Sequence, residues 1–169
     1  MKVETIFLKP TPTVPNSRLP VLIYRGIISG SIANFEATIR ANGWFPDWYS
    51  KMGLYPKHHF HSDAHELIGF ASGAQTGRLG GDGGVDVELE KGDVVVIPAG
   101  VGHLGIGISD DILAIGAYPL GYGIRDFRLC EASEFAEAFR KVQQVPVPPT
   151  DPFLGATGPL PEIWMNAAA

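Results

Sequence analysis

Lys57-His-His-Phe-His-Ser-Asp-Ala-His-Glu66 is the stretch of this 169-residue chain from which its fold and chemistry are best approached. It holds four of the five histidines in the sequence. On a β-strand, alternate side chains share one face. His59 and His61 would therefore point the same way, while His58 and Phe60 would point the other way. Two imidazoles on one face of a strand are a candidate pair of metal ligands.

The remaining ligands would come from the residues that follow and from a later strand. After a turn at 62–64, either His65 or Glu66 points back toward the first pair, but not both. His103 comes after Val94-Val-Val-Ile-Pro98, an apolar run typical of a buried strand, and we expect it beside His59 and His61. Up to three imidazoles and one carboxylate suit Fe, Mn, Co, Ni, Zn or Cu, and ligand type does not choose among them. For His58 and His65 we expect outward-facing or supporting roles, such as a hydrogen bond from His65 that orients Glu66.

The rest of the chain predicts an all-β fold with a few peripheral helices. Between Pro56 and Pro119, short apolar strands alternate with glycine turns, a pattern of sandwiches and barrels. The glycine-rich run 79–84 is compatible with a phosphate-binding loop, but no helix or Gly-Lys-Ser/Thr follows, so we interpret it as a hairpin loop. The other expected elements are an edge strand at 3–8, a buried strand at 21–28, helices at 32–41 and 131–142, and an extended proline-rich tail that wraps the barrel or a neighbouring subunit.

Composition narrows the functional class. Hydrophobic residues make up 45% of the chain and charged residues 18%, so it is globular. The net charge of −5 without a Lys/Arg stripe argues against a nucleic-acid partner. Cys130 is the single cysteine, which excludes an intrachain disulfide. We find no apolar run suited to a signal peptide or a membrane helix, so we expect a cytoplasmic protein without a membrane partner.

Two longer motifs carry a family resemblance. Gly53-x5-His59-x-His61-x4-Glu66-x6-Gly73 and Gly92-x5-Pro98-x-Gly100-x2-His103 resemble the two cupin motifs. The second departs at its end, where Gly107 stands in place of a frequent Asn that is not a ligand. Pro15–Pro20, Tyr24–Gly26 and Gly116–Pro119 extend the likeness to the YjlB-like cupins, whose substrate is not known.

The resemblance implies a single-domain double-stranded β-helix, the jelly-roll barrel, with one divalent transition metal held by His59, His61, Glu66 and His103. Residues 1–50 would form an N-terminal strand, arm and short helix, 51–120 the barrel core, and 121–169 a C-terminal helix and tail, all in one domain. A homodimer is expected for this fold type, with the proline-rich arm and tail adding to a partner's sheet edge.

Three functions compete for such a chain. The first is a metal-dependent enzyme, a dioxygenase, isomerase or lyase, acting on a small polar or anionic molecule. The second is a non-catalytic small-ligand binding or sensor module with a bound metal. The third, a structural cupin of the seed-storage type, is disfavoured because such relatives often lose ligands.

Catalytic candidates must lie near the mouth of the predicted barrel. We select Tyr55, Arg78 and Tyr118, and three more arginines deserve inspection: Arg25, Arg125 and Arg128. An arginine at the mouth would pair with a substrate carboxylate. The aromatic residues between Trp44 and Tyr55 either pack in the core or form one wall of a ligand pocket.

Overall fold

The apolar run after Gly92 forms β7 (Val94–Ile97) in the computed structural model, which describes residues 2–121 and 125–168. Val94 and Val96 pack on one face of its sheet, and Val95 and Ile97 pack on the other. Both faces are covered by other parts of the chain, so the strand has no polar position. This explains the uninterrupted apolar sequence.

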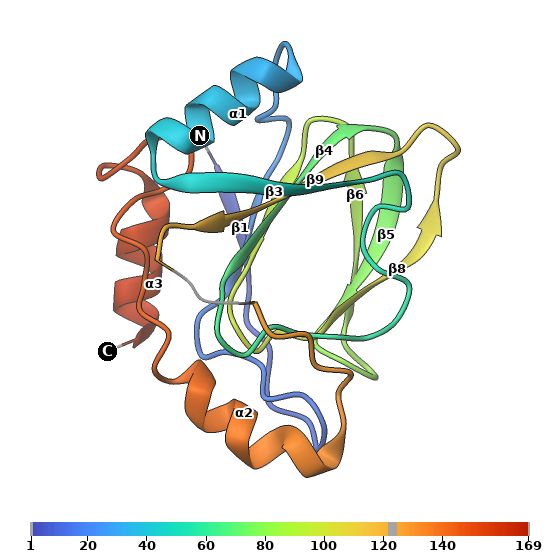
Figure 1. Cartoon of the computed structure of the whole chain (residues 1–169), viewed down its shortest axis with the longest axis vertical. Helices are drawn as coiled ribbons and strands as arrows, with labels where there is room; N and C mark the ends of the chain where they lie inside the picture. The colour runs from blue at the N-terminus through green and yellow to red at the C-terminus, as the bar shows by residue number, and fades with distance from the viewer. Residues whose placement is uncertain (1, 122–124, 169) are drawn as a thin grey trace.

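The strands form two antiparallel sheets within the described ranges (Figure 1). One has six strands in the order β1-β2-β7-β4-β9-β3, and the other has three in the order β6-β5-β8. The remaining strands are β1 (Val3–Ile6), β2 (Val21–Tyr24), β3 (Trp44–Ser50), β4 (Glu66–Ser72), β5 (Ala74–Leu79), β6 (Val85–Glu90), β8 (His103–Ile108) and β9 (Leu113–Pro119). One apolar cluster contains side chains from both sheets and fills the space between them. The predicted double-stranded β-helix is confirmed, including the hairpin loop between β5 and β6.

Two helices cover the outer face of the larger sheet, and a third packs elsewhere, against Val14 and Phe60. In Figure 1, α1 (Ile32–Ala41) lies at the top, α3 (Pro159–Ala168) at the left and α2 (Phe135–Val142) at the bottom. Side chains of α1 and α3 join β2, β4, β7 and β9 in a second apolar cluster. The predicted helix at 131–142 is present, although its first turn is a 3-10 helix, η1 (Ala132–Glu134). No helix within the described ranges is long and apolar enough to cross a membrane.

Two expected elements differ from the sequence prediction. The strand expected at 21–28 ends at Tyr24, because the backbone N–H of Gly26 donates to the Asp93 carboxylate at 2.9 Å in a turn. The tail was expected to be extended, but α3 begins at Pro159. Proline in the first turn of a helix costs no hydrogen bond, because the N–H groups there have no partner within the helix.

The tail nevertheless wraps the barrel of its own chain. Leu160 and Trp164 are fully buried, and the indole N–H of Trp164 donates to the carbonyl of Pro20 at 2.9 Å. Parts of the predicted segments 1–50 and 121–169, namely residue 1, residues 122–124 and residue 169, lie outside the described residues.

Candidate metal centre

Three histidines meet where the two sheets approach each other. His59 and His103 pair across an isolated antiparallel bridge, with backbone N–H···O distances of 2.9 and 3.2 Å, so the two side chains start from opposed backbone positions. One ring nitrogen each from His59, His61 and His103 lies within 4.8 Å of the others. Gly100, at φ +85°, donates its N–H to the carbonyl of His61 at 2.8 Å and so ties the turn before β8 to this segment.

The three rings share one hydrogen-bonding arrangement. Each Nδ1 lies against a backbone carbonyl, and a carbonyl only accepts, so Nδ1 carries the proton and Nε2 keeps its lone pair. Such a bond fixes both the tautomer and the ring orientation of a metal-binding histidine. The acceptors are the carbonyls of Lys57 for His59 at 3.0 Å, Asp126 for His61 at 2.5 Å and Val101 for His103 at 3.0 Å.

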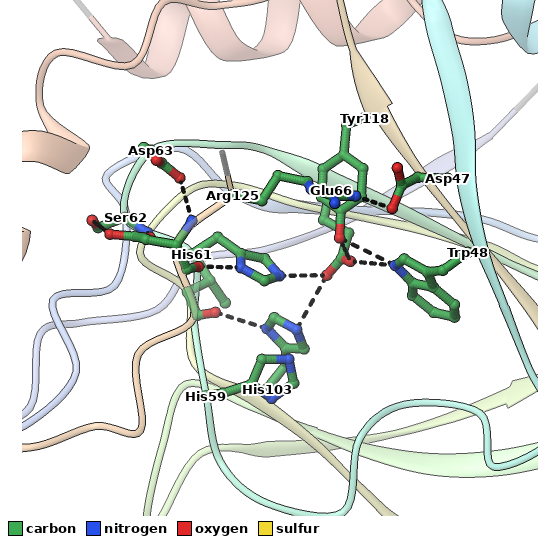
Figure 2. Close-up of polar contacts among 12 residues, drawn as sticks. Asp47, Trp48, His59, His61, Ser62, Asp63, Glu66, His103, Tyr118 and Arg125 are labelled. Atoms are coloured by element: carbon green, nitrogen blue, oxygen red, sulfur yellow. Dashed lines mark hydrogen bonds and ion pairs between the residues drawn. The ribbon is translucent and has the colours of Figure 1, made fainter. Parts of the chain in front are cut away.

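Glu66, the first residue of β4, points at these rings (Figure 2). Its Oε2 lies 3.2 Å from Nε2 of His103 and 3.6 Å from Nε2 of His61. Both Oε2 of Glu66 and Nε2 of His103 are buried without a hydrogen-bond partner in the described part of the chain. Buried polar atoms are rarely left unpaired, and a cation between these atoms would satisfy both. Three imidazoles and one carboxylate therefore fit a divalent transition metal.

The choice between His65 and Glu66 is settled by their surroundings. His65 turns away from the three rings and contacts Trp164, with ring centroids 4.6 Å apart. Its Nδ1 accepts a hydrogen bond from the backbone N–H of Ala99 at 3.0 Å. His58 also faces away, and its Nδ1 lies 3.9 Å from the carboxylate of Asp82. The alternation expected for this segment is therefore observed.

The surroundings of the site favour the ligand forms of His59 and Glu66, whereas Glu66 favours the protonated form of His61. Burial lowers the pKa of His59 to about 3, and His103 acts in the same direction. Burial also opposes the protonation of His61, but the Glu66 carboxylate outweighs it and raises the pKa of His61. Burial would raise the pKa of Glu66, but His103 and His61 hold it well below its usual range. Near neutral pH, His59 is therefore neutral and Glu66 is ionised.

A cavity of about 320 Å³ opens beside the four side chains. Its wall is largely apolar, with Met52, Leu54, Ile68 and Phe127 among the residues that line it. The Phe127 ring stacks on His59, with centroids 4.4 Å apart and planes at 18°. A small organic ligand could place a polar end at the histidines and an apolar body against this wall.

The catalytic candidates fall into two groups. Tyr55 and Tyr118 line the cavity, and so does Arg125, whose guanidinium carbon lies 4.7 Å from the centroid of the Tyr118 ring. Arg125 also forms an ion pair with Asp47 (Figure 2). Arg25 lies elsewhere, where it pairs with the carboxylate of Asp93 at 2.7 Å.

Arg78 is not at the mouth, and its predicted position is wrong. Gln75 and Leu79 on β5 are buried, whereas Arg78 has the opposite parity and points outward. There it pairs with Asp86 on β6 at 2.7 Å, across the outer surface of the smaller sheet. The sequence does not show which face of β5 is the inner one, because polar residues occupy both faces.

Asp126 belongs to the site although the sequence does not indicate it. Asp126 follows the last barrel strand without any periodic pattern, yet its carbonyl accepts from His61 and its carboxylate accepts from Ser62 N and Oγ at 2.6 and 2.5 Å. Arg128, one of the arginines selected for inspection, supports it with an ion pair of 2.9 Å to the same carboxylate. Among the aromatic residues from Trp44 to Tyr55, both interpretations hold: Trp44 is buried in the core, while Trp48 lines the cavity.

Comparison with known proteins gives one relative that spans the chain. No protein-family model matches the sequence. The uncharacterized protein YjlB of Bacillus subtilis is 32% identical over 164 residues, which are 96% of this chain and 97% of that protein.

Solved structures resemble this chain more distantly. A Klebsiella pneumoniae protein with a double-stranded β-helix domain aligns with a TM-score of 0.40 and 15% identity, over 69% of this chain and 78% of that one. A structure of the DMSP lyases RdDddP and RnDddQII aligns with a TM-score of 0.38 and 21% identity, over 67% of this chain. That match spans only 44% of the lyase chain. With a full-length relative at 32% identity and the barrel described above, this protein belongs to the YjlB-like family of cupins.

Proposed function

We propose that His59, His61, Glu66 and His103 hold one divalent transition-metal ion, and that the loaded site acts as a metal-dependent enzyme on a small anionic molecule. One observation carries the proposal. Three imidazoles are locked with Nε2 available, beside a buried carboxylate oxygen without a hydrogen-bond partner among the described residues. A purely structural cluster would leave these atoms desolvated without compensation.

The ligand class follows from charge and shape. A divalent ion beside one carboxylate leaves a net charge of about +1, which favours an anion with two oxygen donors, such as a hydroxy acid, a keto acid or an enediolate. Arg125, stacked on Tyr118, supplies a cation that can orient such a molecule. Met52, Leu54 and Ile68 offer an apolar wall for its carbon body and restrict water.

The reaction belongs to the types that this chemistry supports. A bound divalent metal supplies Lewis-acid polarisation, an activated water or a place for dioxygen. A dioxygenase, an isomerase and a lyase all remain candidates, and so do Fe, Mn, Ni, Co, Zn and Cu. Tyr55 and Tyr118 line the cavity, and their hydroxyl groups are our candidates for donating or accepting a proton in the reaction.

A non-catalytic binding or sensor module is the second candidate, and one observation favours it. The hydroxyl of Tyr118 already donates to Glu66, and Arg125 is already paired with Asp47. Both groups are therefore engaged by the protein before any ligand arrives. An enzyme would have to exchange these contacts for contacts to its substrate.

Elemental analysis tests the metal. Protein purified without chelator or a histidine tag, and reconstituted where necessary, is expected to contain about one equivalent. His61→Ala should lose it, whereas His58→Ala, a neighbouring histidine that faces away, should retain it. A native protein that takes up no metal would refute the proposal.

Calorimetric titration of the metal-loaded protein tests the ligand class with lactate and 3-phenyllactate. Both should bind only the loaded form, and phenyllactate should bind more tightly by on the order of tenfold, because its ring is buried against the apolar wall. Arg125→Gln should weaken both, and Arg78→Gln serves as the matched control. Following the bound acid by NMR separates the two candidates: turnover supports the enzyme, and binding without turnover supports the sensor.

We also propose a cytoplasmic homodimer. The C-terminal tail does not add to the sheet edge of a partner, because α3 packs on the sheet of its own chain. β1, at one edge of the six-stranded sheet, remains the element through which a second copy would add. Light scattering at micromolar concentration should give twice the mass of the chain, and a monomer would contradict the proposal.

A further inference from the structure

A bulge in β3 aims a tryptophan at the candidate metal centre. The register between β3 and β9 pairs Pro46 with Ala117 and Trp48 with Gly116, so Asp47 is the extra residue of a β-bulge. Bulges redirect side chains and are frequent beside functional sites. Here the indole of Trp48 turns into the cavity, next to Glu66 (Figure 2).

Gly116 provides the space that the indole occupies. A Cβ placed on this residue would overlap the Trp48 ring at its Cε2, Nε1 and Cζ2 atoms. Gly116 lies within β9, where the backbone does not need the conformational freedom of glycine and where glycine usually weakens a strand. The absence of a side chain at Gly116 therefore leaves the space that the Trp48 ring occupies.

Trp48 and Tyr118 together occupy one oxygen of Glu66. The indole N–H lies 3.1 Å from Oε1 of Glu66 and 3.1 Å from the hydroxyl of Tyr118, and that hydroxyl donates to the same Oε1. Oε1 thus receives two donors on the side away from the histidines. Oε2 is left facing His103 and His61.

We infer that Trp48, Gly116 and Tyr118 are positioning residues that make Glu66 a one-oxygen ligand and direct its Oε2 at the metal. The inference rests on the metal site proposed above. Two hydrogen bonds to Oε1 fix the carboxylate plane and make binding through both oxygens unfavourable. Without them, the carboxylate can rotate or chelate, and the coordination number of the ion changes.

Cobalt substitution tests this arrangement, because the visible d–d bands of Co²⁺ depend on its coordination number and geometry. In Trp48→Phe, Tyr118→Phe and Gly116→Ala, we expect the bands of the Co²⁺-loaded protein to shift. The Co²⁺ affinity should fall by about 10- to 100-fold, the range found when supporting hydrogen bonds to metal ligands are removed. Tyr118→Phe removes only a hydroxyl, so it keeps the test valid if a larger change prevents folding.

Matched variants separate positioning from general damage. Gly107→Ala adds a methyl group in β8, where nothing lies within 4 Å of a Cβ, and Trp44→Phe removes an indole N–H that donates to the carbonyl of Thr150 in the core. Both should keep the native Co²⁺ spectrum. In a Trp48→Phe background, Gly116→Ala should cause no further spectral change, since the indole that it displaces is already gone.

The outcomes are distinguishable. A native protein that binds no Co²⁺ overturns the proposed metal site and this inference together. A native protein that binds one Co²⁺, with unchanged spectra and affinities in Trp48→Phe, Tyr118→Phe and Gly116→Ala, overturns the positioning role alone. Equal shifts in Gly107→Ala also overturn it, because the effect would then not pass through the indole.

Discussion

The burial of His65 should make the protein sensitive to mild acid, whether or not the proposed metal is bound. The ring is 1% exposed, lies against Trp164 and accepts a hydrogen bond from the backbone N–H of Ala99. Burial lowers its pKa from 6.5 to about 4. A proton on Nδ1 would face the Ala99 N–H, so the folded protein resists protonation that the unfolded chain accepts.

The direction and size of the effect follow from this difference. As the pH falls below 6.5, the unfolded state takes up the proton first, so the free energy of unfolding decreases until the pH reaches about 4 and is level below that. Above 6.5 the ring is neutral in both states and contributes no pH dependence. At pH 5 the loss amounts to about 2 kcal/mol, from ~1.36 kcal/mol for each unit of pKa difference traversed.

Urea unfolding of metal-free protein at pH 8 and pH 5 measures this loss. His65→Asn removes the titration and keeps an acceptor for the Ala99 N–H. The free energy of unfolding of this variant at pH 8 measures the packing lost with the ring. The decrease of that free energy from pH 8 to pH 5 should be smaller than in the native protein, because the titrating group is absent. His59 has a lowered pKa in both proteins, so its contribution cancels. Leu67, a fully buried residue of β4 that does not titrate, provides the control: Leu67→Val should alter packing and keep the native pH dependence. Equal losses in His65→Asn and the native protein would refute the reasoning.

Three further variants test the packing and the surface. Arg78→Gln should leave the urea midpoint and the metal content unchanged, because its pair with Asp86 is on the exposed face of the smaller sheet. Trp164→Ala should lower the free energy of unfolding by about 3–5 kcal/mol, since a fully buried ring is lost, and urea unfolding would detect it. Tyr24→Phe should cost about 1–3 kcal/mol in the same assay, because the buried carboxylate of Asp151 loses a hydrogen bond of 2.7 Å.

The three histidines of the site could be predicted because their positions follow from the local sequence pattern. His59 and His61 share a face by alternation, and His103 follows a strand that is apolar at every position. Whether His65 or Glu66 joins them depends on the path of the turn at 62–64, which alternation does not determine. The buried neighbours of each residue, Trp164 and Ala99 for His65 against Trp48 and Tyr118 for Glu66, provide the answer.

The errors arose where the outcome depends on distant parts of the chain. Prolines in the tail suggested an extended segment, yet Pro159 and Pro161 lie in the first turn of α3, where their missing N–H groups cost nothing. The charge of Arg78 suits a substrate and favours a place at the mouth, but β5 has no apolar alternation strong enough to show which face is buried. In both cases the local sequence is compatible with two outcomes, and the packing partners decide between them.

The residues that contact Glu66 from β3 and β9 could hardly be predicted from the sequence. Trp48 reaches Glu66 through a bulge, which depends on the register between two strands that are far apart in the chain. A bulge adds one residue to a strand and has no sequence motif. Its position can therefore be located only once the pairing of β3 with β9 is known. Gly116 is the residue through which the sequence indicates the contact, because a glycine inside a strand often marks a place where another group comes close. The candidate ligands are thus encoded by their spacing along the chain, whereas the residues proposed to orient Glu66 are encoded by complementary shapes on separate strands.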